Sequence, residues 1–214
     1  MAPGDGSGRR TGSARARGYL YLPMGWLDSI LLSFVALLAV DLASGLVHWA
    51  EDTFGTEATP VVGRWIIAPN ALHHRDAAAF TRKGWLASSW DLLLGALLVG
   101  ALAWRLGWLS WPLVLFCAVG ANANEIHKWN HLGPERVPSF VRGLWRSGVL
   151  QAPEHHSGHH RGAKNTRYCV VTPWLNPLLD RSGFWRGLER LLVPWFGAPR
   201  REDLAPTARN PDGP

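Results

Sequence analysis

The sequence predicts an all-α integral membrane protein with about three transmembrane helices. Three apolar blocks, at residues 26–49, 85–104 and 108–126, each have about the 20-residue length that crosses a bilayer as a helix. Each block begins with a tryptophan, and tryptophans gather at membrane interfaces. Those at or just outside the block ends are Trp26, Trp49, Trp85, Trp104, Trp108, Trp111 and Trp129. The alternative, a soluble bundle of unusually apolar helices, fits the block lengths less well.

The polar ends of the chain frame one predicted domain. Residues 1–18 are rich in Gly, Ser and Arg and lack apolar residues for a core, so we expect a disordered basic head. Residues 199–214 are polar and Pro-rich, which predicts a loose tail. Residues 19–198 remain as a single membrane domain. The two cysteines, Cys117 and Cys169, have neither the number nor the spacing of a disulfide framework, a zinc ribbon or a redox motif.

All nine histidines of the chain fall into four tight groups. Imidazole is the commonest metal ligand that side chains supply, and a set this large without a cysteine pair suits two metal ions better than one. The groups are His48; His73 and His74; His127 and His131; and His155, His156, His159 and His160. The sequence therefore predicts a histidine-rich di-metal site.

The predicted topology brings all four histidine groups to one face of the membrane. His48 ends the first block, the doublet follows it, and the second and third blocks form a hairpin that returns the chain to the same side. Segments on this side, 51–84 and 128–214, carry 17 of the 22 Lys and Arg residues, so the positive-inside rule makes it cytoplasmic. The arginines of the head conflict with this orientation: either the first span inserts against them or the head folds back.

Helical spacing points side chains of the first and third blocks to common faces. Asp41, Gly45, His48 and Asp52 follow one another by four, three and four residues, so a helix stacks them along one side. Asp41 lies within an apolar block, where an ionisable group is a candidate for function; hydrogen bonding to a neighbouring helix is the equal alternative.

The third block ends with the same kind of spacing. Asn124, His127 and His131 follow one another by three and four residues, so both imidazoles face the same way. Glu125 points elsewhere. Asn124 and Asp52 are therefore candidates for metal ligands or for groups that support the ligands.

The string E154-H-H-S-G-H-H160 contains two histidine pairs at four-residue spacing. Pairs of this kind lie on adjoining strips of one helix and can reach two metal ions a few ångströms apart. The alternative is a histidine-rich interfacial loop with unspecific metal affinity. No H-E-x-x-H string occurs, which disfavours a zinc protease of that type.

Two later stretches, 139–151 and 183–197, have an apolar stripe opposite arginines and are predicted to be interfacial amphipathic helices. Packing onto the protein's own core is the alternative for each. Between them, residues 168–180 form a β-branched run that ends in turn residues, and the sequence assigns it no role.

Many imidazoles at a membrane face suit oxidative chemistry on lipids. Iron held by imidazoles keeps open positions for dioxygen, and an iron pair can oxidise an unactivated C–H bond. A metal-dependent lipid hydrolase, or a membrane protein that binds metal without catalysis, would use similar ligands. The residues alone leave these three classes open.

Five strings resemble the plasmanylethanolamine desaturase family, also called Kua or CarF lipid desaturases, which is related to the plant plastid desaturase of phosphatidylglycerol palmitate. They are DLASGLVHWAEDTFG at 41–55, HH at 73–74, NEIHKWNH at 124–131, HHSGHH at 155–160 and YCVVTPWLN at 168–176. The resemblance covers roughly residues 26–196. It implies two non-haem iron ions, dioxygen as oxidant and electrons from an external protein of the cytochrome b5 or ferredoxin type. It also implies that all nine histidines are ligands and that Asp52 orients His48 or binds metal.

From this resemblance we expect desaturation of an alkyl or acyl chain on an intact phospholipid, with vinyl-ether formation on 1-O-alkyl ethanolamine lipids preferred. The alternatives are an acyl desaturase or hydroxylase acting on another phospholipid, or a non-catalytic metal-binding membrane protein. Many vinyl-ether-forming members differ from this chain around Lys83 and at Ala163 and Lys164, which bears on the substrate rather than on the metal site. A bacterial inner membrane is the expected location, and no nucleic-acid partner is expected.

Overall fold

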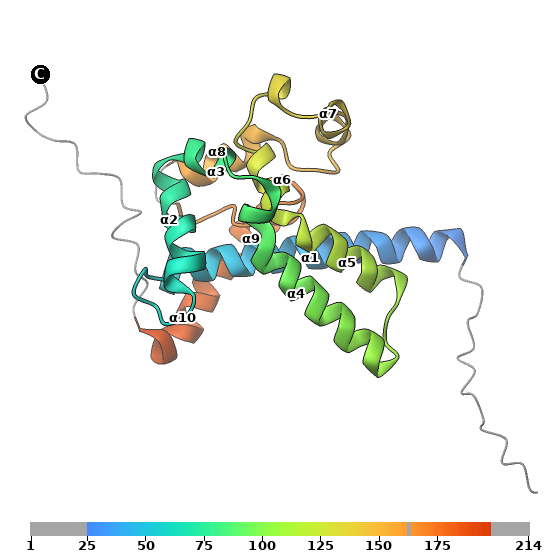
Figure 1. Ribbon diagram of the computed structural model, residues 1–214, viewed down its shortest axis with the longest axis horizontal. Coiled ribbons are helices and arrows are strands. Elements are labelled where there is room, and N and C mark those ends of the chain that lie inside the picture. The colour runs from blue at the N-terminus through green and yellow to red at the C-terminus, as the bar shows by residue number, and fades with distance from the viewer. Residues whose placement is uncertain (1–24, 162–163, 198–214) are drawn as a thin grey trace, which may run out of the picture.

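The computed structural model describes residues 25–161 and 164–197 (Figure 1). All regular secondary structure within these two stretches is helical, as the sequence predicts. The predicted head at 1–18, the predicted tail at 199–214 and Ala163 lie outside the described residues.

Two helices are long and apolar enough to cross a membrane: α1 (Trp26–Phe54) and α4 (Trp85–Leu106). Helix α1 continues past the predicted end of the first block, so His48 and Asp52 lie on one uninterrupted helix. Large side chains of α4 face outward, with Leu97, Leu98 and Leu102 each about 60% exposed. A bilayer would cover this surface with lipid tails.

The third predicted span is not one helix. Helix α5 (Trp111–Ala121) has 11 residues, or about 16 Å at 1.5 Å per residue, and α6 (Ala123–Trp129) follows after a break at Asn122. The side chain of Asn122 donates to the carbonyl of Ala118 and accepts from Trp85 Nε1, at 2.9 and 3.0 Å. Asparagine competes in this way with helical hydrogen bonds, which accounts for the interruption.

Helix α5 packs against both α1 and α4 (Figure 1). Trp111 Nε1 donates to Ser33 Oγ of α1 at 3.2 Å. At the other end of α5, a Cβ added to Gly120 would lie 3.4 Å from Val40 of α1. The next helix, α6, is held to α4 by a hydrogen bond from Asn124 Nδ2 to the carbonyl of Ser88.

The remaining elements are short helices, most of them grouped around the C-terminal end of α1 (Figure 1). They are η1 (Gly63–Ile67), α2 (Ala68–Arg75), α3 (Ala77–Thr81), η2 (Pro134–Arg136), α7 (Ser139–Arg146), α8 (Pro153–His160), α9 (Leu175–Arg181) and α10 (Phe184–Phe196). The histidines therefore lie on α1, α2, α6 and α8 and in the turn after α6.

The two predicted amphipathic segments form helices α7 and α10. In α10 the predicted stripe divides: Phe184, Leu188 and Leu192 pack against the core, whereas Leu191 and Trp195 are exposed. Trp185, which lies outside the predicted stripe, is buried with its ring centroid 6.1 Å from that of Trp49. Helix α10 therefore packs one edge onto the protein's own core and leaves another edge free for a membrane surface.

Residues 168–172 run through the core as a buried segment without regular secondary structure. Buried backbone polar groups need partners, and here distant side chains provide them. Asn176 accepts from Cys169 N and donates to its carbonyl, at 3.0 and 2.8 Å. Asn130 Nδ2 donates to the carbonyl of Val170 at 2.9 Å. Gly45 of α1 lets the segment approach, because a Cβ there would lie 2.6 Å from Cys169 Sγ.

Candidate metal centre

One cluster of ligand atoms gathers five histidines from α2, α6, α8 and the turn after α6. Their nitrogens all lie within 4.8 Å of one another, and the members are His73, His127, His131, His156 and His160. The Nε2 atom of His156 lies 2.8 Å from that of His127 and 3.0 Å from that of His160. The Nε2 atoms of His127 and His131 are 3.3 Å apart. We call this set the five-histidine cluster.

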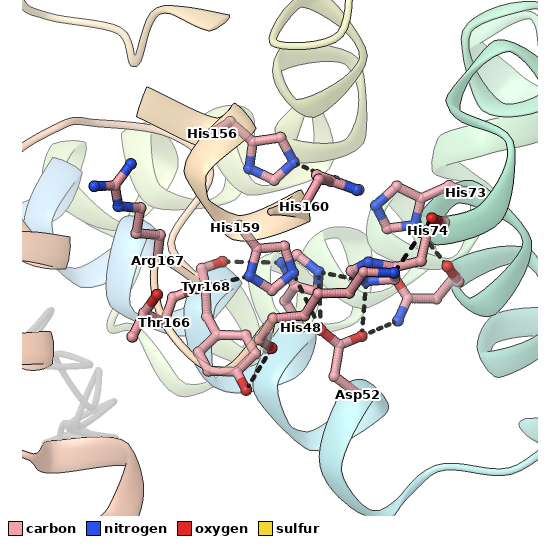
Figure 2. A network of polar contacts seen from close by, with 12 residues as sticks. His48, Asp52, His73, His74, His156, His159, His160, Thr166, Arg167 and Tyr168 are labelled. Atoms are coloured by element: carbon pink, nitrogen blue, oxygen red, sulfur yellow. Dashed lines mark hydrogen bonds and ion pairs between the residues drawn. The ribbon is translucent and has the colours of Figure 1, made fainter. Parts of the chain in front are cut away.

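A second cluster joins α1, α2 and α8 around one carboxylate (Figure 2). Asp52 Oδ1 lies 3.0 Å from His74 Nε2, and Asp52 Oδ2 lies 3.3 Å from His159 Nε2 and 3.5 Å from His48 Nε2. His48 and His74 meet through their Nε2 atoms at 3.4 Å. We call this set the Asp52 cluster.

The two clusters are neighbours because two histidine doublets are divided between them. His73 belongs to one cluster and His74 to the other, and their ring centroids are 4.3 Å apart. His159 and His160 are divided in the same way, at 5.4 Å. Two adjoining ligand sets are the arrangement that a pair of metal ions requires.

Carbonyls of residues 166 and 168 fix two imidazoles of the Asp52 cluster (Figure 2). His159 Nδ1 lies 2.7 Å from the Thr166 carbonyl, and His48 Nδ1 lies 3.1 Å from the Tyr168 carbonyl. A carbonyl only accepts, so each Nδ1 carries the proton and each Nε2 presents a lone pair to the centre of the cluster.

Asn70 supports both clusters from the first half of α2. Its carbonyl accepts from His73 Nδ1 at 2.6 Å, and its side-chain Nδ2 donates to Asp52 Oδ1 at 2.7 Å. Sequence reasoning did not identify this residue. The signal was present, because Asn70 precedes His73 by three residues and therefore shares its face of a helix.

Burial keeps the imidazoles of the short helices neutral. It lowers the pKa of His73, His127 and His156 well below the usual 6.5, and neighbouring imidazoles lower it further. Burial is also the main reason why the pKa of His131 falls to about 4. Since a metal ion binds the deprotonated nitrogen, these groups are ready to act as ligands near neutral pH.

The donor set fits transition-metal ions. Within the described part of the chain, the Nε2 atom of His73 is buried and has no hydrogen-bond partner, although its Nδ1 is paired. A buried lone pair of this kind is costly unless something binds it. Imidazole nitrogens with one carboxylate, and no thiolate, suit iron as well as zinc.

Three residues predicted for the site lie outside both clusters. His155 Nε2 is 3.4 Å from Asn176 Nδ2. Asp41 Oδ1 accepts from the backbone N–H groups of Val171 and Thr172, at 2.9 and 3.0 Å. Asp41 therefore anchors the buried segment 168–172: within the described residues its side-chain hydrogen bonds go to this segment, rather than to a neighbouring helix as the alternative supposed. The third residue, Asn124, joins α6 to α4.

An apolar cavity of about 300 Å³ begins at the histidines, where His48, His73 and His127 line it. It extends along α1, α4 and α5 as far as Val40, which lies eight residues, or about 12 Å of helix, before His48. Val99 of α4 also lines it.

Charged and polar residues line the same cavity near the clusters. Glu51, which precedes Asp52 on α1, and Asp91 of α4 both line it. Lys83 also lines the cavity, and its carbonyl accepts from the side chain of Lys128, the neighbour of His127. The cavity is therefore polar next to the histidines and apolar away from them.

The family model and three similar proteins that match this chain are all described as desaturases. A family model described as a lipid desaturase domain matches residues 37–203. Plasmanylethanolamine desaturase 1 of Mus musculus is 36% identical over 191 residues, with 82% of this chain and 69% of the relative covered. Plasmanylethanolamine desaturase of Myxococcus xanthus is 35% identical, with 85% of this chain and 66% of the relative covered.

A plant relative matches over a similar length. The chloroplastic fatty acid desaturase 4-like 2 of Arabidopsis thaliana is 31% identical, with 85% of this chain and 66% of the relative covered. The chain thus spans about two thirds of the length of each of these three relatives. No solved structure matches. The length and identity of these matches show that the chain belongs to the lipid desaturase family.

Proposed function

We propose that this protein is an integral membrane desaturase that uses two iron ions and dioxygen to introduce a double bond into an alkyl or acyl chain of a phospholipid. Among the possible substrates we propose a 1-O-alkyl ethanolamine lipid, on which the new double bond would form a vinyl ether. The observation that carries the proposal is the meeting of two adjoining ligand clusters with the polar end of an apolar cavity.

The ligands divide naturally between the two ions. The five-histidine cluster would hold one iron, and the Asp52 cluster, with its three histidines, would hold the other. This assignment uses eight of the nine histidines and leaves out His155, which contacts Asn176. Asn70 and the carbonyls of Thr166 and Tyr168 would hold the ligands in orientation.

When bound, an iron pair supplies the activation of dioxygen that oxidation of an unactivated C–H bond needs. The reaction removes one hydrogen atom from each of two neighbouring carbons and leaves a double bond between them. Dioxygen is reduced to two water molecules, with two electrons and two protons supplied from outside. We propose an electron-transfer protein of the cytochrome b5 or ferredoxin type as the donor.

The chain's own residues position the lipid. The apolar walls of the cavity at Val40 and Val99 would hold the hydrocarbon and exclude water, because apolar surface is favourably removed from water there. Glu51, Lys83 and Asp91 would keep the polar end of the lipid close to the histidines.

This polarity supports reaction near the head of the lipid. A chain held with its polar end beside the clusters presents its first carbons to the metal ions, and a vinyl ether forms at the carbons next to the ether oxygen. A double bond in the middle of the chain would instead require the apolar part of the cavity to lie beside the histidines.

The surroundings of the site support a membrane location. Two helices of spanning length run away from the histidine end, and most Lys and Arg residues of the described part of the chain belong to segments at that end. We propose that the metal site faces the cytoplasm, on the basis of this positive charge. The Ala-, Gly- and Arg-rich composition, which is typical of a GC-rich bacterial genome, supports a bacterial inner membrane as the location.

Expression of the wild type and of His156→Ala in a host without such an activity tests the function. The expected result is a phospholipid two mass units lighter with the wild type alone, in purified protein that contains about two iron ions per chain. A lipid that has gained an oxygen atom would instead indicate hydroxylation. Stoichiometric zinc, or unchanged lipids when an electron donor is supplied, would contradict the proposal.

A further inference from the structure

The cavity opens sideways between α1 and α4. Several residues that line it are also exposed: Val47 of α1 is 49% exposed, and Trp90 and Val99 of α4 are 42% and 43% exposed. Gly95 of α4 lies between them, lines the cavity and is exposed as well. Together these residues mark a stretch of α1 and α4 along which the cavity reaches the protein surface.

The arrangement of the helices explains why there is a gap. Helix α5 packs against both α1 and α4 and forms another wall of the cavity, where Cys117 and Gly120 line it. The four residues named above belong to the two helices that are long enough to span a membrane. The opening between these helices therefore faces the region that lipid tails would occupy. Trp65 of η1 also lines the cavity and is exposed, so the cavity reaches the surface there as well.

Gly95 has no local reason to be glycine. It lies in the middle of α4, where glycine is less favourable than alanine, and a Cβ added there would meet nothing within 4 Å. Close packing between helices does not explain it either. What its small size does provide is space at the rim of the cavity.

We propose that the apolar chain of a phospholipid enters the cavity sideways from the bilayer through this opening, and that Gly95 sets its width. We call the opening, bounded by Val47, Trp90, Gly95 and Val99, the lateral portal. This inference rests on the proposed function. It adds the route of the substrate and a residue that controls access to the metal ions without contacting them.

Gly95→Leu tests the portal, and the same helix offers a matched control. Gly100 also lies in α4 and a Cβ there would also meet nothing within 4 Å, but it does not line the cavity. Gly95→Leu, Gly95→Ala and Gly100→Leu would be reconstituted in phosphatidylethanolamine vesicles. The second thiol of the chain, Cys169, is buried, so alkylation of Cys117 by N-ethylmaleimide reports access to the cavity separately from activity.

Gly95→Leu is expected to slow both Cys117 alkylation and formation of the desaturated lipid by about tenfold, because extra methylene groups overpack a narrow passage. Iron content should not change, and Gly95→Ala and Gly100→Leu should behave like the wild type. If Gly95→Leu alkylates and reacts at the wild-type rate, or if Gly100→Leu is equally slowed, the portal is refuted.

Two further readouts keep the test decisive. If Gly95→Leu loses its iron, Val47→Trp replaces it in the test, because this substitution narrows the opening from the α1 side. Slower Cys117 alkylation and slower desaturation would again support the portal, and wild-type rates would again refute it. If the wild type produces no desaturated lipid, the proposed function fails. Protection of Cys117 by phosphatidylethanolamine, compared with lipid-free detergent, would then still support the portal, and equal alkylation in both would refute it.

Discussion

His155 and His156 are adjacent on α8, and replacing each in turn separates the ligands of the metal site from its surroundings. His156 is fully buried, and its Nε2 lies 2.8 and 3.0 Å from the Nε2 atoms of His127 and His160. His155 has its Nε2 3.4 Å from the amide of Asn176 instead. His156→Ala is therefore expected to remove a ligand, and His155→Ala is not.

The size of the two effects follows from these contacts. Loss of a group that merely supports a ligand lowers metal affinity by about 10–100-fold, so loss of His156 itself should exceed this and reduce iron from about two ions per chain to about one or fewer. His155→Ala leaves Asn176 donating to Gln151 Oε1 at 3.1 Å and to the Cys169 carbonyl at 2.8 Å. Its cost is one weak hydrogen bond, about 1 kcal/mol of unfolding free energy, with iron retained.

The assay is metal analysis of the two purified variants, together with their melting temperatures and lipid products. A His155→Ala variant that folds but loses as much iron as His156→Ala would refute the division of ligands argued above. Equal iron in His156→Ala and the wild type would refute the five-histidine cluster itself.

Three further predictions follow from the same contacts. Burial holds the pKa of His131 at about 4, against 6.5 for an exposed imidazole, so the unfolded chain binds protons at a pH where the folded chain does not. The melting temperature of the metal-free protein should therefore fall as the pH is lowered from about 6.5 towards 4. A melting temperature that stays constant over this range would contradict the prediction. Asn70→Ala removes the hydrogen bond to Asp52 Oδ1 and should weaken iron binding by about 10–100-fold in a chelator titration, with unchanged affinity as the opposing result. Asp41→Ala leaves the N–H groups of Val171 and Thr172 buried and unpaired, which should lower the free energy of unfolding by about 1–3 kcal/mol for each group. Denaturant unfolding should show this loss of stability, while the folded protein keeps its iron. Loss of iron with unchanged stability would show that Asp41 serves the metal instead.

The rigidity of the ligand clusters comes from elements other than the short helices that carry most of the histidines. Most of the histidines come from helices that are too short to hold their own geometry, since α2 and α8 have eight residues each. The long helix α1 and the buried segment 168–172 supply the rigidity, through Asp52 and the Tyr168 carbonyl. We expect metal binding to stabilise the short helices in return, because binding energy is available for folding when a site forms only in the folded state.

Local periodicity accounts for what the sequence predicted correctly. The spacing of Asp41, Gly45, His48 and Asp52 placed them on one face of a helix, and all four are buried along α1. The spacing of His156 and His160 likewise brought both to one cluster. These relations depend only on 3.6 residues per turn.

The predictions that the structure changed are those in which contacts beyond local periodicity decided the outcome. The apolar block at 108–126 has the composition of one helix, but the side chain of Asn122 divides it into α5 and α6. His155 and His159 share a helical strip, yet only His159 reaches a cluster. Asn176, which contacts His155, lies 21 positions away, so the spacing of neighbouring residues could not predict this contact.

The sequence by itself determined the helical class, the apolar helices and the gathering of histidines at one end of them, because hydrophobic length and helical repeat are properties of neighbouring residues. Only the tertiary structure decided which histidine belongs to which cluster, that Asn70 and two carbonyls orient the ligands, and where the cavity opens. His48 meets the Tyr168 carbonyl across 120 residues, and Asp41 meets Val171 across 130. Contacts of this range are set by how the whole chain packs and buries its polar groups, and no short pattern of residues encodes them.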